Sequence, residues 1–223
     1  MTDKKISIIL VDDHPLLRKA LKDVLDEEPD LNVIAEAADG EEAVKLSLEL
    51  APDIVIMDIS MPKLNGLEAI KQIKSLKPGI IIMALTVHVE DEFILEILQA
   101  GAAGYLVKSV YGKEVVQAIK AVASGDMVFS PAIGKNLLKH AAKYPVRPVA
   151  LQAGEKLSIR EMEILKLTAH GKSNQDIANT LNLNLRTVKG YLTEVFSKLN
   201  VSSRTEAVIT ALRAGIITTD DIQ

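Results

Sequence analysis

The sequence predicts a doubly wound α/β domain with a five-stranded parallel sheet, followed by a small all-α domain of four helices. Over the first 125 residues, short apolar segments alternate five times with amphipathic segments of helical period. Beyond residue 155 only helical patterns are found. A chain of 223 residues is long enough for two domains of ordinary size. We therefore expect an α/β domain over residues 1–125 and a helical domain over residues 155–223.

The five strand candidates are short and apolar on both faces, as expected for strands buried in a parallel sheet. They are Ser7 to Val11, Val33 to Ala37, Ile54 to Met57, Ile80 to Leu85 and Gly104 to Val107. The segments that follow each strand carry their apolar residues on one helical face. These helix candidates are Leu16 to Asp26, Glu41 to Leu50, Gly66 to Leu76, Glu92 to Ala100 and Lys113 to Ser124. This alternation is the pattern of a doubly wound fold.

Residues 126–154 are expected to link the two domains. The segment from Ala132 to Lys143 has a helical pattern, which ends before Pro145 and Pro148. Proline removes a backbone donor and disfavours a helical conformation in the residue before it. The region is therefore predicted to be a semi-extended linker with one helical segment.

The helical domain contains four short amphipathic segments. They are Ser158 to Ala169, Asn174 to Leu181, Leu185 to Leu199 and Thr205 to Ala214. Each begins with a residue that can accept hydrogen bonds from the free N–H groups of the first turn. These capping candidates are Ser158 with Glu161 three residues later, Ser173, Asn184, and either Ser203 or Thr205. The pattern predicts a compact all-α bundle.

Composition excludes several classes of protein. The chain is 48% hydrophobic and 25% charged and has no cysteine, which excludes disulfides, thiolate chemistry and cysteine-based metal sites. Its longest apolar runs are far shorter than the roughly 20 residues of a membrane span, and its first ten residues lack a signal-peptide core. A cytoplasmic protein without a membrane partner is expected.

Charge is distributed unevenly along the chain. Residues 1–125 contain 13 basic and 21 acidic side chains, whereas residues 155–213 contain nine basic and six acidic ones. The net charges are therefore −8 and +3. This asymmetry is compatible with an acidic control domain and a domain that faces DNA, although so small a positive charge is weak evidence for nucleic acid.

Acidic residues follow two of the predicted strands. Asp12 and Asp13 come after the first strand and Asp58 ends the third, while Thr86 ends the fourth and Lys108 follows the fifth. The carboxyl ends of parallel strands meet at one edge of a sheet, so these side chains should converge. Three carboxylates repel one another and require a cation. A set of hard oxygen ligands suits Mg²⁺, which also accepts a phosphate oxygen.

The chemistry that this arrangement permits is phosphoryl transfer to a carboxylate. Asp58 is the candidate nucleophile. The Mg²⁺ ion, the Lys108 ammonium and the Thr86 hydroxyl would stabilise charge on the transferring phosphoryl oxygens. Taken alone, an aspartate at a strand end is more often a helix cap, and a lone lysine is more often a surface charge. Their combination at the right strand ends favours a functional site.

Residues 5–125 resemble a response-regulator receiver domain, which has a flavodoxin-like fold. The matching motifs are Val11-Asp12-Asp13-His14-Pro15, Asp58-Ile59-Ser60-Met61-Pro62 with Asn65-Gly66, Leu85-Thr86, and Gly104-Tyr105-Leu106-Val107-Lys108. The resemblance implies that Asp58 is the phosphoacceptor. It also implies that Asp13, Asp58 and the Ser60 carbonyl bind Mg²⁺, with Asp12 acting through water. Thr86 and Tyr105 would form the switch, the hydroxyl moving toward the phosphoryl group and the ring swinging inward.

The second and third segments of the helical domain read as a helix, a tight turn and a longer helix. Apolar faces of the two helices can pack together, with Ile177 and Leu181 on one and Val188 and Leu192 on the other. The outward set of the longer helix suits the major groove of DNA, and it contains Arg186, Thr187, Lys189, Gly190 and Thr193. The pattern alone is equally compatible with a bundle that binds a protein.

Residues 155–215 resemble the LuxR-type output domain of NarL/FixJ response regulators. The matching segments are Leu157-Ser158-Ile159-Arg160-Glu161, Gly171 to Ala178, Thr187-Val188-Lys189 and Leu199 to Ala207. By this resemblance Asn174, Thr187, Lys198 and Arg204 contact DNA phosphates, and Lys189, Gly190 and Thr193 face base edges. Two residues depart from the family: Tyr191 replaces a usual histidine, and Gly190 has no side chain for base readout. We expect modest affinity that depends on a dimer.

The expected function is that of a response regulator, a phosphoacceptor rather than an enzyme, which assists its own phosphorylation and dephosphorylation. Its partners would be a sensor histidine kinase, double-stranded DNA and a second copy, with RNA polymerase as a further candidate. Three alternatives remain. An aspartyl-phosphate phosphatase would need an acid where Ser60 stands, and a flavin or nucleotide binder would need a Gly-rich loop after the first strand. A regulator that no longer uses phosphorylation is disfavoured by the intact acidic set.

Overall fold

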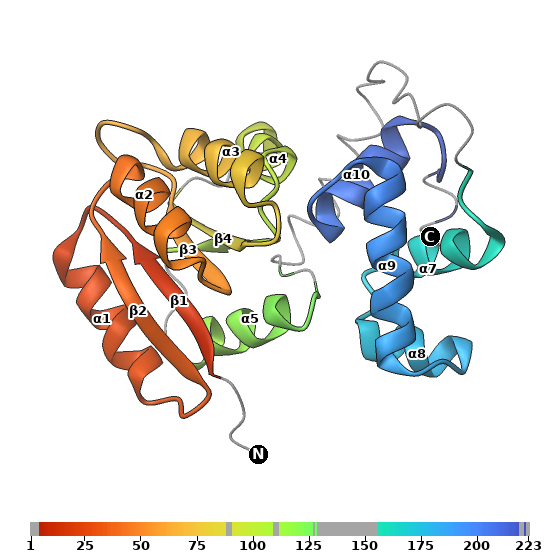
Figure 1. The fold of residues 1–223 in the computed structure, drawn as a ribbon, viewed down its shortest axis with the longest axis horizontal. Coiled ribbons are helices and arrows are strands. Elements are labelled where there is room, and N and C mark those ends of the chain that lie inside the picture. Colours follow the sequence, from red (N-terminus) through yellow and green to blue (C-terminus); the bar gives the residue numbers. More distant parts are fainter. Residues whose placement is uncertain are drawn as a thin grey trace.

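The computed structural model describes residues 5–87, 91–108, 112–126, 128, 156–218 and 221. The chain folds into two lobes, an α/β receiver-like lobe and a helical lobe (Figure 1). The expected helix at 132–143 and most of the expected linker lie outside the described residues. None of the helices in the ranges above is long and apolar enough to cross a membrane.

The first lobe contains a five-stranded parallel sheet in the order β2-β1-β3-β4-β5. Its strands are β1 (Ile6–Val11), β2 (Leu31–Ala37), β3 (Ile54–Asp58), β4 (Ile81–Thr86) and β5 (Gly104–Val107). The predicted doubly wound α/β class is confirmed. The strand that follows β1 in the chain lies on one side of β1, and the later strands lie on the other side. The order of strands therefore reverses between β1 and β3, and ligands of such folds bind at this point.

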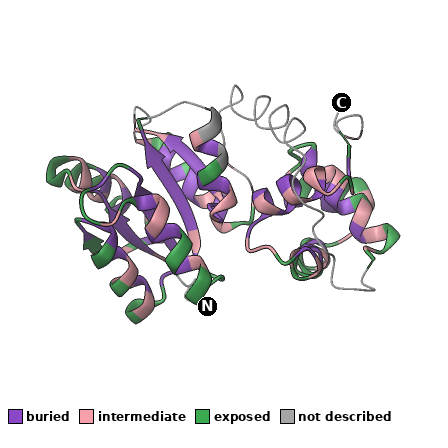
Figure 2. Cartoon of the chain, turned by 90° about the horizontal axis from the view of Figure 1, so that it is seen from above, coloured by how far each residue is buried: buried purple, intermediate pink, exposed green. Residues whose placement is uncertain are grey.

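Helices cover both faces of the sheet (Figure 1). They are α1 (Pro15–Asp26), α2 (Gly40–Leu50), α3 (Gly66–Leu76), α4 (Asp91–Gln99) and α5 (Lys113–Ala123). Apolar residues of α2, α3 and α4 pack in one core cluster, and those of α1 and α5 pack in the other. The strands between these layers are largely buried (Figure 2).

One strand differs from the expectation of apolar residues on both faces. Exposed and less exposed side chains alternate along β2, where Asn32 and Ile34 are exposed. The reason is its place at the edge of the sheet, where it pairs with β1 alone among the described strands. The expectation was therefore wrong for β2, whereas β3 is buried along its whole length.

The second lobe is the predicted four-helix domain. Its helices are α7 (Ile159–Ala169), α8 (Asn174–Leu181), α9 (Leu185–Leu199) and α10 (Arg204–Arg213). Capping boxes begin α7 and α8, as the serines at their starts predict. Asn184 caps α9, and Ser203 rather than Thr205 caps α10. Helices α8 and α9 are joined by a short turn in which Asn182 has a left-handed backbone.

The two lobes contact each other through α4 and α10. Ile209 of α10 is 5% exposed and belongs to the apolar cluster of the first lobe. A second contact joins the end of α5 to the start of α8, where Asn174 bonds to both Ser124 and Asp126. The receiver-like lobe therefore contacts the helical lobe at α8 and α10.

Candidate functional site

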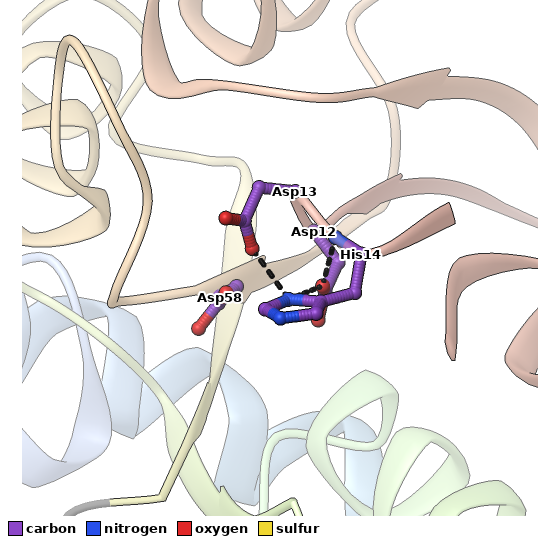
Figure 3. A group of neighbouring side chains, drawn as sticks. All are labelled: Asp12, Asp13, His14 and Asp58. Carbon is purple, nitrogen blue, oxygen red and sulfur yellow. Dashed lines mark hydrogen bonds and ion pairs between the residues drawn. The ribbon is translucent and has the colours of Figure 1, made fainter. Parts of the chain in front are cut away.

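Two buried carboxylates lie at the carboxyl edge of the sheet. Asp12 directly follows β1 and Asp58 ends β3, and they are 1% and 0% exposed. Ligand atoms from Asp12, Asp13, His14 and Asp58 all lie within 4.8 Å of one another (Figure 3). The sequence-predicted acidic residues are thus brought together, because β1 and β3 are neighbours in the sheet and end at the same edge.

Lys108 bridges the two buried carboxylates. Its Nζ lies 2.7 Å from Asp58 Oδ2 and 2.8 Å from Asp12 Oδ2. Burial works to lower the pKa of Lys108, but the two carboxylates outweigh burial and hold this pKa above its ordinary value. The ammonium is therefore charged at neutral pH. It neutralises part of the acidic site and stands next to the predicted nucleophile.

Burial raises the pKa of Asp58 above its ordinary value, even though the Lys108 ammonium and the Ser60 N–H oppose it. The Ser60 N–H donates to Asp58 Oδ1 at 3.0 Å. A raised pKa marks a carboxylate whose negative charge is poorly solvated. A cation beside such a carboxylate stabilises its negative charge, and the carboxylate is a reactive nucleophile when it is ionised.

The loop after Asp58 is fixed by backbone hydrogen bonds. The Ile59 N–H donates to the Leu85 carbonyl at 3.1 Å, and the Gly66 N–H donates to the Ile59 carbonyl at 3.0 Å. Asn65 caps α3 by accepting from the Glu68 N–H. A Cβ on Gly66 would lie 2.1 Å from the Asp58 carbonyl oxygen, so only glycine permits this close approach. The loop therefore holds Asp58 against the edge of the sheet.

Thr86 and Tyr105, the predicted switch pair, are both buried in this structure. Thr86 ends β4 and is 0% exposed, while Tyr105 is 1% exposed and packs in the apolar cluster that includes Ile94 and Ile209. The Lys108 N–H donates to the Thr86 carbonyl at 2.8 Å, which ties β5 to β4 beside the site. Because Ile209 belongs to α10, the helical lobe contributes to the burial of the Tyr105 ring.

Sequence reasoning missed two residues at this edge. His14 Nδ1 lies 2.7 Å from Asp13 Oδ1 and 3.3 Å from Asp12 Oδ1 (Figure 3). Arg18 donates to the Asp12 carbonyl at 2.5 Å and pairs with Glu36. The proximity of His14 could have been noticed from its adjacency to the acidic pair. The contacts of Arg18 could not have been predicted, because its partner Glu36 is 18 positions away along the chain.

The acidic edge fits a small divalent cation. Asp12, Asp13 and Asp58 supply carboxylate oxygens close enough to share one ion, and oxygen donors are the ligands that Mg²⁺ prefers. The Ser60 side chain is exposed at the same loop. A cation bound there would offset the repulsion among the three carboxylates.

The helical lobe presents a polar face on α9. Arg186, Lys189, Gly190 and Thr193 are exposed, and Thr187 is partly exposed. The opposite face of this helix is buried, with Val188, Leu192, Val195 and Leu199 in the core clusters. The predicted outward set is therefore on the surface of the lobe.

The remaining residues predicted to contact DNA already have protein partners. Asn174 and Arg204 are 3% and 5% exposed, and Arg204 Nη1 donates to Asn174 Oδ1 at 2.7 Å. Lys198 Nζ lies 2.8 and 2.7 Å from the two carboxylate oxygens of Glu161. In this structure all three side chains are therefore bound by other protein groups, and Asn174 and Arg204 are buried.

Replacing Glu161 with Gln should lower the free energy of unfolding of the helical lobe by about 1 to 2 kcal/mol at pH 7, since a capping box and a buried pair are both weakened. Burial works to raise the pKa of Glu161, but Lys198 and Ser158 outweigh it and hold this pKa below its ordinary value. The stabilisation is therefore present above the ordinary pKa of a glutamate and is lost as the pH falls through the lowered pKa of the folded state.

Urea denaturation at several pH values measures this effect. Glu163→Gln is the matched control, because Glu163 is exposed and its ion pair with Arg160 lies at the surface. A loss of stability for Glu161→Gln that is equal at pH 7 and pH 3 would show that the charge of Glu161 does not matter.

Comparison with known families divides the chain in the same way as the fold. A model of the response regulator receiver domain matches residues 8–120, and a model of bacterial regulatory proteins of the luxR family matches residues 155–211. Together these matches cover the sheet edge with Asp12 and Asp58 and the helices α8 and α9.

Known relatives match this chain along nearly their whole length. The transcriptional regulatory protein LiaR of Bacillus subtilis (strain 168) is 38% identical over 215 residues, with 95% of this chain and 99% of the relative covered. The transcriptional regulatory protein DegU of Brevibacillus brevis is 33% identical over 227 residues, with 96% of each chain covered. The crystal structure of the response regulator ChrA, from a heme-sensing two-component system, superposes with a TM-score of 0.51 at 31% identity and covers 96% of this chain and 99% of its own. The chain therefore belongs to the two-component response regulators that join a receiver domain to a LuxR-type helix-turn-helix domain and regulate transcription.

Proposed function

We propose that a sensor histidine kinase phosphorylates Asp58 and that this phosphorylation controls dimerisation and sequence-specific DNA binding. The observation that carries the proposal is that Lys108 Nζ lies within hydrogen-bonding distance of both Asp58 and Asp12, the two buried carboxylates at the switch point of the sheet. A structural aspartate would need no bridging ammonium and no second buried carboxylate. We assign the receiver to residues 1–125, the linker to 126–154 and the DNA-binding domain to 155–223.

In the transfer step, an Asp58 carboxylate oxygen attacks the phosphorus of a phosphohistidine. A P–O bond forms, the P–N bond breaks, and the leaving imidazole takes a proton from solvent. The Lys108 ammonium and the Thr86 hydroxyl offset the charge of the phosphoryl oxygens. Asp12, Asp13, Asp58 and the Ser60 carbonyl would hold Mg²⁺, which supplies further charge stabilisation when bound. The same residues assist hydrolysis of the phosphoryl group, and no turnover of other substrates is assigned.

On the output side, α9 is the proposed recognition helix. Lys189, Gly190 and Thr193 would face base edges, and Arg186 and Thr187 would lie beside the backbone. Asn174, Lys198 and Arg204 are the remaining proposed phosphate contacts. Since Gly190 has no side chain, one helix reads few bases, and a dimer that reads two half-sites about one DNA turn apart would supply the rest of the affinity.

The expected partners are a second copy of the chain, double-stranded DNA and the sensor kinase, with RNA polymerase as a further candidate. Because its proposed target is chromosomal DNA, we place the protein in the cytoplasm. The Tyr105 and Thr86 pair would transmit the phosphorylation state to the face formed by α4, β5 and α5.

Selection from a pool of random 40-bp duplexes tests the proposed DNA binding. Protein treated with acetyl phosphate and Mg²⁺ should enrich two repeated half-sites. Lys189→Ala should change the preferred base within each half-site, whereas the exposed control Lys113→Ala on α5 should not. Enrichment of no common sequence would contradict sequence-specific binding.

A further inference from the structure

Arg18 closes the turn between β1 and α1. It lies in the first turn of α1, and its Nη1 donates to the Asp12 carbonyl at 2.5 Å. Its Nε donates to the Glu36 carboxylate on β2 at 3.1 Å. The Arg18 side chain is 17% exposed. One largely buried guanidinium therefore joins the end of β1, the start of α1 and the neighbouring strand β2.

The Asp12 carbonyl belongs to the peptide group that leads to Asp13. A peptide group is planar, so a bond that fixes the direction of its carbonyl also fixes the direction of its N–H and of the following Cα. The Asp12 side chain is held independently, because its Oδ1 accepts from the His14 N–H at 2.8 Å and its Oδ2 lies 2.8 Å from Lys108 Nζ. The bond from Arg18 therefore orients the backbone of Asp13.

Asp13 carries a buried oxygen that a cation would stabilise. Its Oδ1 accepts no hydrogen bond from the residues that the structure describes, although His14 Nδ1 lies 2.7 Å away. A buried carboxylate oxygen without a hydrogen-bond donor is stabilised by a bound cation. The direction of the Asp13 carboxylate relative to Asp12 and Asp58 depends on the orientation of its backbone.

We infer that Arg18 is a positioning residue for the divalent cation of this site: it orients the peptide between Asp12 and Asp13 so that the Asp13 carboxylate faces the ion. Arg18 acts through the backbone and is assigned no contact with the ion. This inference rests on the proposed function, because it assumes that Asp13 is a ligand of Mg²⁺. Replacing a residue that orients a metal ligand typically weakens metal binding by about 10- to 100-fold.

Charge and position predict opposite effects of removing the Arg18 guanidinium. The guanidinium is a cation near the acidic edge, so its charge alone disfavours a second cation there. If only charge mattered, Arg18→Met would tighten Mg²⁺ binding. If Arg18 orients Asp13, the same substitution weakens Mg²⁺ binding.

Titration of the full-length protein with Mg²⁺, followed by backbone amide NMR shifts, measures this affinity. Arg18→Met should raise the Kd for Mg²⁺ about 10-fold. Lys19→Met removes an equal charge from an exposed position of α1 and should change the Kd less than about 2-fold. The spectrum of each variant without Mg²⁺ reports whether the variant is folded.

Arg18→Lys is a second, milder variant. It keeps the charge and most of the aliphatic stem, but its single ammonium lacks the planar fork that reaches the Asp12 carbonyl and Glu36 together. The Kd for Mg²⁺ should therefore rise about 3-fold. An unchanged Kd in both Arg18 variants, or tighter binding by Arg18→Met, would overturn the inference.

Phosphorylation by acetyl phosphate gives a second readout. In Arg18→Met the Mg²⁺ concentration for half-maximal adduct formation should rise about 10-fold. The rate at saturating Mg²⁺ should stay within about 2-fold of the wild-type rate. A merely structural role would instead lower the rate at saturating Mg²⁺. That result, with an unchanged half-maximal concentration, would contradict a role of Arg18 in cation binding.

The inference and the proposed function fail in different ways. If wild-type amides near Asp13 and Asp58 do not shift on addition of Mg²⁺, the proposed cation site is refuted and the inference falls with it. If these amides shift and Arg18→Met binds Mg²⁺ as tightly as Lys19→Met, the cation site stands and only the role of Arg18 is refuted.

Discussion

Replacing Asp58 with Asn will remove the phosphoryl adduct that the wild-type protein forms with acetyl phosphate and Mg²⁺. The amide is not a nucleophile, and the remaining carboxylate in contact with Lys108 is Asp12, which is already held by the His14 N–H. Adduct formation should fall by more than about 1,000-fold. Intact-protein mass spectrometry measures the adduct directly.

Asp23→Asn is the matched control for this experiment. Asp23 is an exposed residue of α1, away from the acidic edge, and its replacement should leave the adduct unchanged. An adduct of undiminished yield on Asp58→Asn would mean that another group at this edge accepts the phosphoryl group. The assignment of the phosphoacceptor would then be wrong.

Gly66→Ala should have the largest effect on the receiver among substitutions that add a single methyl group. The added Cβ would lie 2.1 Å from the Asp58 carbonyl oxygen and 2.7 Å from Ile59 Cα, and both contacts are with backbone. The loop must move, so we expect a loss of about 3 kcal/mol in the free energy of unfolding. The rate of phosphorylation should fall too, because the same loop positions Asp58.

Gly79→Ala provides the control, because a Cβ there would meet no atom within 4 Å and the backbone needs no left-handed conformation. Its stability should lie within about 0.5 kcal/mol of wild type. Urea denaturation of both variants measures the difference. Equal stabilities of Gly66→Ala and Gly79→Ala would show that the loop after Asp58 can change conformation at little cost and does not fix the nucleophile.

Much of the fold could be predicted from periodicity and caps. Strand β5 and helices α3, α8 and α9 have the predicted bounds, because each is delimited by a local signal such as Asn65 or Asn184. The predicted burial of β2 was wrong, because the residues of a strand do not by themselves indicate whether it lies at the edge of a sheet.

The acidic site could be predicted because the topology of a parallel sheet brings strand ends together. Asp12, Asp58 and Lys108 belong to three different strand ends, and Lys108 Nζ still lies within 3 Å of a carboxylate oxygen of each aspartate. The contact of Asp126 with Asn174 could not be predicted, because 48 residues separate them and Asp126 lies in the segment assigned to the linker. Local patterns carry no information on how two separately folded domains dock.

The affinity of the full-length protein for a selected duplex, with and without acetyl phosphate, tests the central claim most directly. We predict that phosphorylation of wild type tightens binding about 10-fold or more, accompanied by dimerisation, and that Asp58→Asn shows no change. Equal affinities of phosphorylated and unphosphorylated wild-type protein would contradict the account, because DNA binding would then be independent of the acidic site.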